Sequence, residues 1–118
     1  MRLVELDLRR DGDVVHASLQ GEIDLSNASE LRTELSTATA NDALGLIVDL
    51  SEVRYLDSAG LHLLHHLRED VQARGQQLVL VIPPDSVVRD TIRLAGLDWH
   101  AGVFETAQAA RDQIPQAG

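Results

Sequence analysis

Apolar and polar positions alternate at the start of the chain. Between residues 4 and 9, Val and Leu side chains are separated by charged ones, which is the period of a half-buried strand. The pair Asp11-Gly12 is typical of a hairpin turn. Alternation resumes over residues 14–19 and ends at the stretch 21–24. The pattern therefore predicts a β-hairpin.

Beyond the hairpin, short apolar runs alternate with helical spacing. The runs 44–50 and 78–82 are apolar almost without a break, which is typical of inner, parallel strands buried on both faces. Spacing of three and four residues predicts helices at four places. We expect one to begin at Ser26 and end near Asn41, and the others to cover 58–74 before Gly75, 85–95 before Gly96, and 106–113 after a short strand over 101–104.

The expected order is β-β-α-β-α-β-α-β-α. Strands that alternate with helices form a sheet covered by helices, joined by crossover connections. A chain of 118 residues suits one hydrophobic core. The sequence therefore predicts a single α/β domain over residues 1–118, with a mixed β-sheet, an N-terminal hairpin at one side and about four helices packed against the sheet.

Composition narrows the classes of function. There are 10 Lys and Arg against 19 Asp and Glu, a formal net charge of −9. Nucleic-acid binding depends on clustered basic residues, and acidic membrane surfaces repel such a chain, so we expect neither partner. The absence of Cys excludes disulfides, thiolate zinc sites and cysteine catalysis. The longest apolar run is too short to span a membrane, and acidic residues come too early for a secretory signal, so a soluble, cytoplasmic protein is expected.

The segment most suggestive of function is Asp57-Ser58-Ala59-Gly60, at the start of the helix expected over 58–74. On a helical wheel one arc collects the core positions, namely Gly60, Leu63, Leu64, Leu67 and Val71. Ser58 falls opposite that arc, so its side chain is expected in solvent at the helix N-terminus. Two interpretations remain open. Ser58 or Asp57 only caps the helix, or Ser58 is a regulated hydroxyl whose phosphate would be stabilised by free N–H groups and the helix dipole.

Enzyme, metal and cofactor sites are poorly supported. A nucleophile elbow needs Gly two residues before and after its Ser, but Leu56 takes the first of these places. His62 and His66 have the spacing of metal ligands on a helix, yet Leu63 replaces the Glu of the zinc motif and no third ligand is evident. No glycine-rich phosphate loop is present. We therefore expect no catalytic residue, no metal site and no cofactor.

Three carboxylates deserve separate consideration. Asp49, within an apolar run, is favoured as a structural group that caps a neighbouring loop, and Asp24 is equally suited to a helix cap or a functional role. If Asp24 and Asp57 converge near Ser58, they form an acidic rim suited to a basic partner or a metal-bound phosphate donor.

Four stretches in a fixed order resemble the anti-sigma factor antagonists of the STAS family. They are Gly21-Glu22-Ile23-Asp24, Ile47-Val48-Asp49-Leu50-Ser51, Tyr55-Leu56-Asp57-Ser58-Ala59-Gly60-Leu61 and Leu94-Ala95-Gly96-Leu97. The resemblance implies a mixed sheet with helices and a bacterial phosphoprotein that regulates transcription by partner switching. In such proteins the unmodified form binds an anti-sigma factor that is also a serine kinase, and the sigma factor is released.

The resemblance also implies site residues. The kinase, with its own Mg-ATP, would phosphorylate Ser58, the phosphoprotein would dissociate, and a separate serine phosphatase would reset it. Asp24 matches an acidic residue that contacts the kinase, and the expected partner-binding set is Glu22, Asp24, Asp57, Gly60, Leu61 and His62. The alternative is a STAS scaffold or regulatory subunit in a stress-signalling assembly or a lipid-transport ATPase.

Two positions depart from the family pattern. Many relatives carry a second Ser where Ala59 stands, which leaves Ser58 as the only hydroxyl of the motif. Relatives commonly have Gly where His62 stands. An imidazole at that position would narrow the set of kinases that dock, or contact the phosphate.

Overall fold

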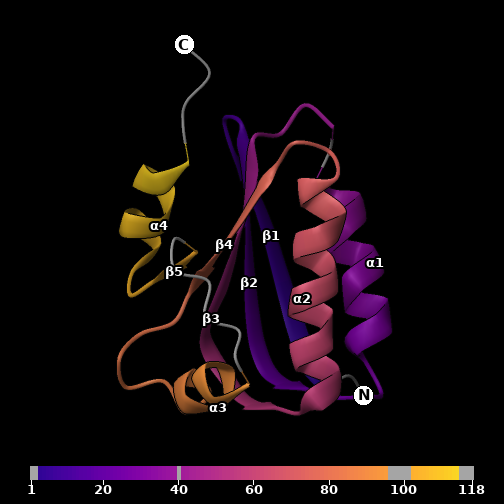
Figure 1. Ribbon diagram of the computed structural model, residues 1–118, viewed down its shortest axis with the longest axis vertical. Helices are drawn as coiled ribbons and strands as arrows, with labels where there is room; N and C mark the ends of the chain where they lie inside the picture. The colour runs from indigo at the N-terminus through magenta and orange to yellow at the C-terminus, as the bar shows by residue number, and fades with distance from the viewer. Residues whose placement is uncertain (1–2, 40, 96–101, 115–118) are drawn as a thin grey trace.

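The computed structural model describes residues 3–39, 41–95 and 102–114, and it contains one five-stranded sheet in the order β1-β2-β3-β4-β5 (Figure 1). The elements are β1 (Val4–Asp11), β2 (Val14–Ile23), α1 (Ala28–Ala38), β3 (Gly45–Leu56), α2 (Ser58–Gln72), β4 (Gln77–Val81), α3 (Arg89–Leu94), β5 (Val103–Phe104) and α4 (Ala107–Gln113). β1 and β2 form the antiparallel hairpin, and the other neighbours are parallel. The predicted element order and mixed sheet are confirmed.

The sheet separates a large hydrophobic core from a small one. Helices α1 and α2 cover one face, and α4 covers part of the other (Figure 1). In β3, Leu46, Val48 and Leu50 point into the large core, whereas Ile47 belongs to the small core beneath α4. This burial on both sides explains why β3 and β4 carry nearly continuous apolar runs.

The buried residues of helix α2 are the five that the helical wheel selects. They are Gly60, Leu63, Leu64, Leu67 and Val71. Its outer face is joined to α1 by Arg32, whose guanidinium donates two hydrogen bonds of 2.9 Å to the Asp70 carboxylate. These hydrogen bonds hold the pKa of the Asp70 carboxyl below its usual range. Among the described helices, none combines the length and apolar character needed to cross a membrane.

Helix α1 begins later than predicted and ends earlier. Ser26 is not its cap, because the N–H and the hydroxyl of Ser26 both donate to the Asp24 carboxylate. Asn27 occupies the N-cap position instead. At the other end, the N–H and hydroxyl of Thr39 both donate to the Leu35 carbonyl oxygen, and the non-helical ψ of 80° at Thr39 ends the helix before Asn41. The predicted helix was therefore too long at both ends.

Two further boundaries were wrong. β3 continues six residues past Leu50 to Leu56, paired only with β2 over that stretch. Residues 83–88 form turns rather than helix, with the Ser86 hydroxyl accepting from the Val88 N–H, so α3 is shorter than the expected 85–95. Gly96 and Ala101, which figured in the expected ends of a helix and a strand, lie outside the described residues.

Candidate functional site

The parallel strands β2, β3 and β4 all end on the same side of the molecule, the lower end in Figure 1. We call this the carboxyl edge and define it as residues 23–27, 55–59 and 82–95. Ile23 pairs with Leu56 at the ends of β2 and β3, and the Asp57 N–H donates to the Ile23 carbonyl oxygen at 3.3 Å. The loop that contains Asp24 is thereby placed beside the start of α2.

Asp57 is the cap of helix α2. Its carboxylate accepts hydrogen bonds from the Ala59 N–H at 2.9 Å and the Gly60 N–H at 3.1 Å. Ser58 is the first residue of the helix and is exposed, as predicted, and its hydroxyl makes no hydrogen bond to the described residues. The capping interpretation therefore applies to Asp57 and leaves the Ser58 hydroxyl available. It also means that two of the N–H groups expected to receive a phosphate are already engaged.

The loop before α1 is held by its own hydrogen bonds. The Asp24 carboxylate accepts from the Ser26 N–H at 2.9 Å, and the Asp24 N–H donates to the Asn27 side-chain oxygen. Asn27 is 5% exposed and donates to the Glu22 carbonyl oxygen. Asp24 thus stabilises the turn before α1, while its carboxylate remains partly exposed on the carboxyl edge.

The other expected partner-binding residues differ in exposure. Glu22 is half-buried, and its carboxylate lies 4.0 Å from the Arg54 guanidinium. Gly60 is buried, and a Cβ there would collide with the Leu56 side chain and crowd Ile23. Leu61 packs against the large core. Gly60 therefore allows α2 to pack close to the sheet, and it does not provide a direct surface contact.

Asp49 has a local structural partner. Its carboxylate accepts from both the N–H and the hydroxyl of Ser51, where the pairing of β3 with β2 shifts register. Asp49 therefore has a structural role, but it binds within its own strand and does not cap a neighbouring loop.

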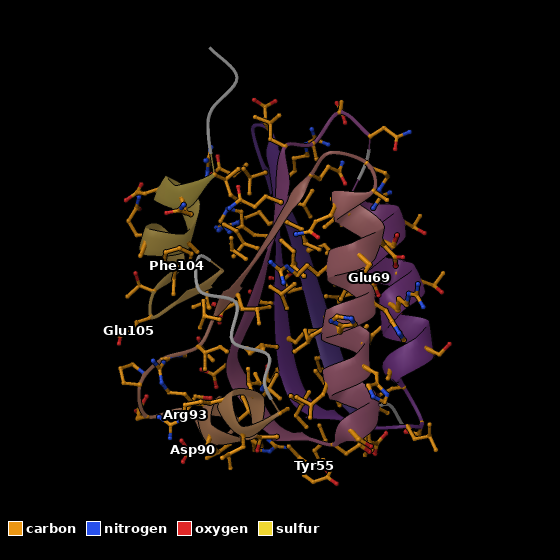
Figure 2. The ribbon with its side chains drawn as sticks, viewed as in Figure 1. Tyr55, Glu69, Asp90, Arg93, Phe104 and Glu105 are labelled. Atoms are coloured by element: carbon orange, nitrogen blue, oxygen red, sulfur yellow. The ribbon has the colours of Figure 1, made fainter. Side chains whose placement is uncertain are left out.

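Exposed apolar side chains on the carboxyl edge were missed by the sequence analysis. The exposed fractions are 82% for Leu25, 49% for Tyr55, 69% for Val87 and 84% for Leu94. Tyr55 lies at the lower end of the molecule, with Asp90 and Arg93 of α3 on the same side (Figure 2). Isolated apolar residues in loops and at helix ends have no period that would reveal them. These four side chains give the carboxyl edge exposed apolar area of the kind that a protein partner covers.

A shallow groove of about 250 Å³ lies between α1 and α2, next to Ser58 along helix α2. Its lining consists of Leu25, Ala28, Ser29, Arg32, Ala59, His62, Leu63 and His66. The imidazole rings of His62 and His66 are 6.1 Å apart, and His65 lies 3.6 Å from the Glu69 carboxylate. In the described ranges, no three His, Asp or Glu side chains are arranged so that they could hold a metal ion.

Comparisons with known proteins agree with this geometry. The family model for the STAS domain matches residues 5–110. The chain belongs to the STAS domain family. The anti-sigma-F factor antagonist RsfB of Mycobacterium tuberculosis is 36% identical to this STAS domain over 94 residues, which cover 79% of the chain and 75% of the relative.

Solved structures give the same result. An anti-sigma factor antagonist from Mycobacterium paratuberculosis superposes with a TM-score of 0.81 and 26% identity, over 94% of this chain and 93% of that one. The unphosphorylated and phosphorylated forms of SpoIIAA have the same fold, with TM-scores of 0.74 and 0.70 at 22% and 21% identity, over 92% of this chain and 95% and 98% of theirs. The expected STAS domain of the anti-sigma factor antagonist kind is confirmed.

Proposed function

We propose that this STAS domain is an anti-sigma factor antagonist switched off by phosphorylation of Ser58. The unphosphorylated form binds an anti-sigma factor that is also a serine kinase, and the sigma factor is released. The kinase transfers the terminal phosphoryl group of its ATP to the Ser58 hydroxyl, whose proton is lost as the phosphate ester forms and ADP leaves. The phosphoprotein dissociates, and a serine phosphatase hydrolyses the ester.

The observation that carries this proposal is the state of the Ser58 hydroxyl. It is exposed, it makes no hydrogen bond to the described residues, and it stands on the first turn of a helix fixed by the Asp57 cap. A kinase needs a hydroxyl that reaches solvent from a defined position. Leu25 and Tyr55 on the same edge supply apolar contact area of the kind that a protein partner covers.

The physical basis of the switch is charge. A phosphate adds a charge of about −1.5 to −2 at neutral pH. At Ser58 it would join the Asp57 carboxylate, which already accepts the N–H groups of Ala59 and Gly60. A partner complementary to a neutral hydroxyl would have to cover two anions, and burying poorly paired charge costs several kcal/mol. A loss of about 3 kcal/mol lowers affinity roughly a hundredfold.

The fold itself can remain unchanged. Ser58 is exposed, whereas the buried face of α2 begins at Gly60. A phosphate on the solvent side of the helix therefore displaces no core side chain, and the partner alone detects the modification.

The remaining site residues support this interface in different ways. We assign Asp24 and Asp57 to an acidic rim that faces basic groups of the kinase, with Glu22 and the neighbouring Arg54 beside it. Leu61 and His62 flank the contact, and Gly60 keeps α2 close to β3. No step of the proposed cycle requires catalysis or a cofactor from this chain.

The test is phosphorylation by the cognate anti-sigma factor. The purified chain is incubated with that kinase and Mg-ATP, and its intact mass is measured. A gain of one phosphate is expected, with none for Ser58→Ala and full modification of the control Ser29→Ala, which removes an exposed hydroxyl on the α1 side of the neighbouring groove. Phosphorylation of Ser58→Ala, or stable binding of the kinase without any modification, would favour a STAS subunit with another role.

A further inference from the structure

His62 lies one turn after Ser58 on the solvent face of α2. Residues four apart are neighbours on a helix surface, and both of these side chains are exposed. Side chains on a helix lean toward its N-terminus, so the His62 imidazole extends toward the turn that begins with Ser58. His62 also lines the α1–α2 groove, together with Ala59, the residue that follows Ser58.

A phosphate on Ser58 would find few other favourable partners at the start of α2. The N–H groups of Ala59 and Gly60 donate to the Asp57 carboxylate. Arg32 lines the same groove, but its guanidinium is bound to Asp70 through two hydrogen bonds. Within the described part of this groove, the imidazoles of His62 and His66 are the remaining groups that can take up a positive charge, and His62 is the one a single turn from Ser58.

We infer that His62 is the counter-charge of the phosphorylated Ser58 side chain and makes the release of the partner depend on pH. This inference rests on the proposed function, because it requires a phosphate at Ser58. When His62 is protonated, its imidazolium pairs with the phosphate and lessens the negative charge that the partner meets. When His62 is neutral, the partner meets the full charge of the phosphate and of Asp57.

Charged groups occur on each element next to His62. Arg32 of α1 lines the same groove as His62, the loop before α1 carries Asp24, and Asp57 caps α2. On α2 itself, the His66 ring lies 6.1 Å from His62 and 6.0 Å from His65. Because these charges are present in both forms of the chain, a difference between the two forms reports the phosphate.

An interaction between His62 and the phosphate must shift the titration of the imidazole and that of the phosphate by equal amounts. An anion one turn away favours imidazolium, so phosphorylation is expected to raise the pKa of His62 by about 0.3 unit, the size of an exposed helical ion pair. By linkage, His62 is expected to lower the second pKa of the phosphate by the same amount. Such a shift corresponds to a roughly twofold change in the ratio of partner affinities between low and high pH.

The experiment uses the full chain with phosphoserine incorporated at position 58 during synthesis, so no kinase is needed. Phosphorus NMR follows the phosphate, and proton–nitrogen NMR follows the imidazoles, from pH 5 to pH 9. We expect the pKa of His62 to rise on phosphorylation and the phosphate pKa to be higher in His62→Ala than in the parent. His65→Ala is the matched control, because His65 lies seven residues from Ser58, about 10 Å further along the helix.

Equal His62 pKa values with and without the phosphate would overturn the inference, and so would equal phosphate titrations in the parent and His62→Ala. An effect of His65→Ala as large as that of His62→Ala would also overturn it, since the helix charge as a whole would then be responsible. Failure of the kinase to modify Ser58 would count against the proposed function without affecting these titrations.

Discussion

The two ends of the sheet are built differently. At the end opposite the carboxyl edge, the hairpin edge, three loops are bound to one another: residues 11–13, 41–44 and 73–76. The Leu44 N–H donates to the Asp13 carbonyl oxygen at 2.7 Å, and the buried Gln76 side chain donates to the Ala43 carbonyl oxygen at 3.1 Å. Arg10 reaches Asp42 at 3.2 Å. On the carboxyl edge the loops also contain internal hydrogen bonds, but Leu25, Tyr55, Val87 and Leu94 remain in solvent.

This difference separates stability from recognition. At the hairpin edge, polar groups of the three loops bind one another. Residues 11–13, 41–44 and 73–76 include no exposed large apolar side chain. The carboxyl edge fixes its backbone in the same way but leaves apolar side chains and the Ser58 hydroxyl unused. Changes on the carboxyl edge should therefore alter partner binding more than folding, and changes on the hairpin edge the reverse.

The largest expected effect is that of a permanent charge at Ser58. Ser58→Asp should weaken binding of the anti-sigma factor roughly a hundredfold, because a loss of about 3 kcal/mol follows from a poorly paired charge in the interface. Ser58→Ala should bind like the parent and remain permanently active. Calorimetric titration gives both affinities. Equal affinities of the two variants would show that charge at this position is not the control.

Gly60, which directly follows the carboxyl-edge segment 55–59, should affect folding, because it is buried. Gly60→Ala should lower the free energy of unfolding by about 2 kcal/mol, since the new methyl group collides with Leu56 in a packed core. Gly12, on the hairpin edge, has open space around its Cβ position but a φ of +60°, so Gly12→Ala should cost only about 1 kcal/mol. Urea unfolding measures the free energy of unfolding of both variants. A larger decrease for Gly12→Ala than for Gly60→Ala would contradict the internal role assigned to Gly60.

The exposed apolar residues give a matched pair. Leu25→Ser should reduce affinity for the anti-sigma factor about tenfold, the cost of truncating a good interface contact, with little change in stability. Leu8, 43% exposed on β1 and away from the carboxyl edge, is the control. Leu8→Ser should leave that affinity unchanged. If both variants bound equally well, the apolar side chains of the carboxyl edge would have no part in recognition.

The smallest effect concerns His16 near the hairpin edge. Burial lowers the pKa of His16, and the positive charge of Arg9 lowers it further. The unfolded chain therefore binds a proton at this site more tightly, and stability should decline as the pH falls below about 6.5, the pKa of an unperturbed His. His16→Gln should decline less steeply between pH 7.5 and pH 5 in thermal unfolding. A steeper decline in stability for His16→Gln than for the parent would mean that the folded chain favours the protonated imidazole of His16.

Periodicity predicted most of the fold because most elements bury a regular face. The wheel of α2 selected its buried positions and placed Ser58 in solvent, as the structure shows. The pattern failed where side chains bind locally. Asp24 holds Ser26 in a turn, which delays α1, and the Ser86 hydroxyl holds a turn before α3. Such competing hydrogen bonds leave no hydrophobic signature.

The later half of β3 escaped prediction for a different reason. After Asp49 it pairs with β2 alone and twice shifts register, so its side chains need not be apolar on both faces. At the site, sequence reasoning left open whether Ser58 or Asp57 capped α2, because both residue types are good caps. The four exposed apolar residues of the carboxyl edge come from three separate segments, and only folding brings these segments to one end.

The most direct test of the account is a footprint of the partner on the isotopically labelled chain. Amide NMR signals are compared with and without unlabelled anti-sigma factor, for the unmodified chain and for the chain phosphorylated at Ser58. We expect changes at residues 24–27, 55–62 and 86–94 of the unmodified chain, none at residues 11–13, 41–44 and 73–76, and none anywhere at equal concentrations of the phosphorylated chain. A footprint on the hairpin edge, or the same footprint from both forms, would contradict the account.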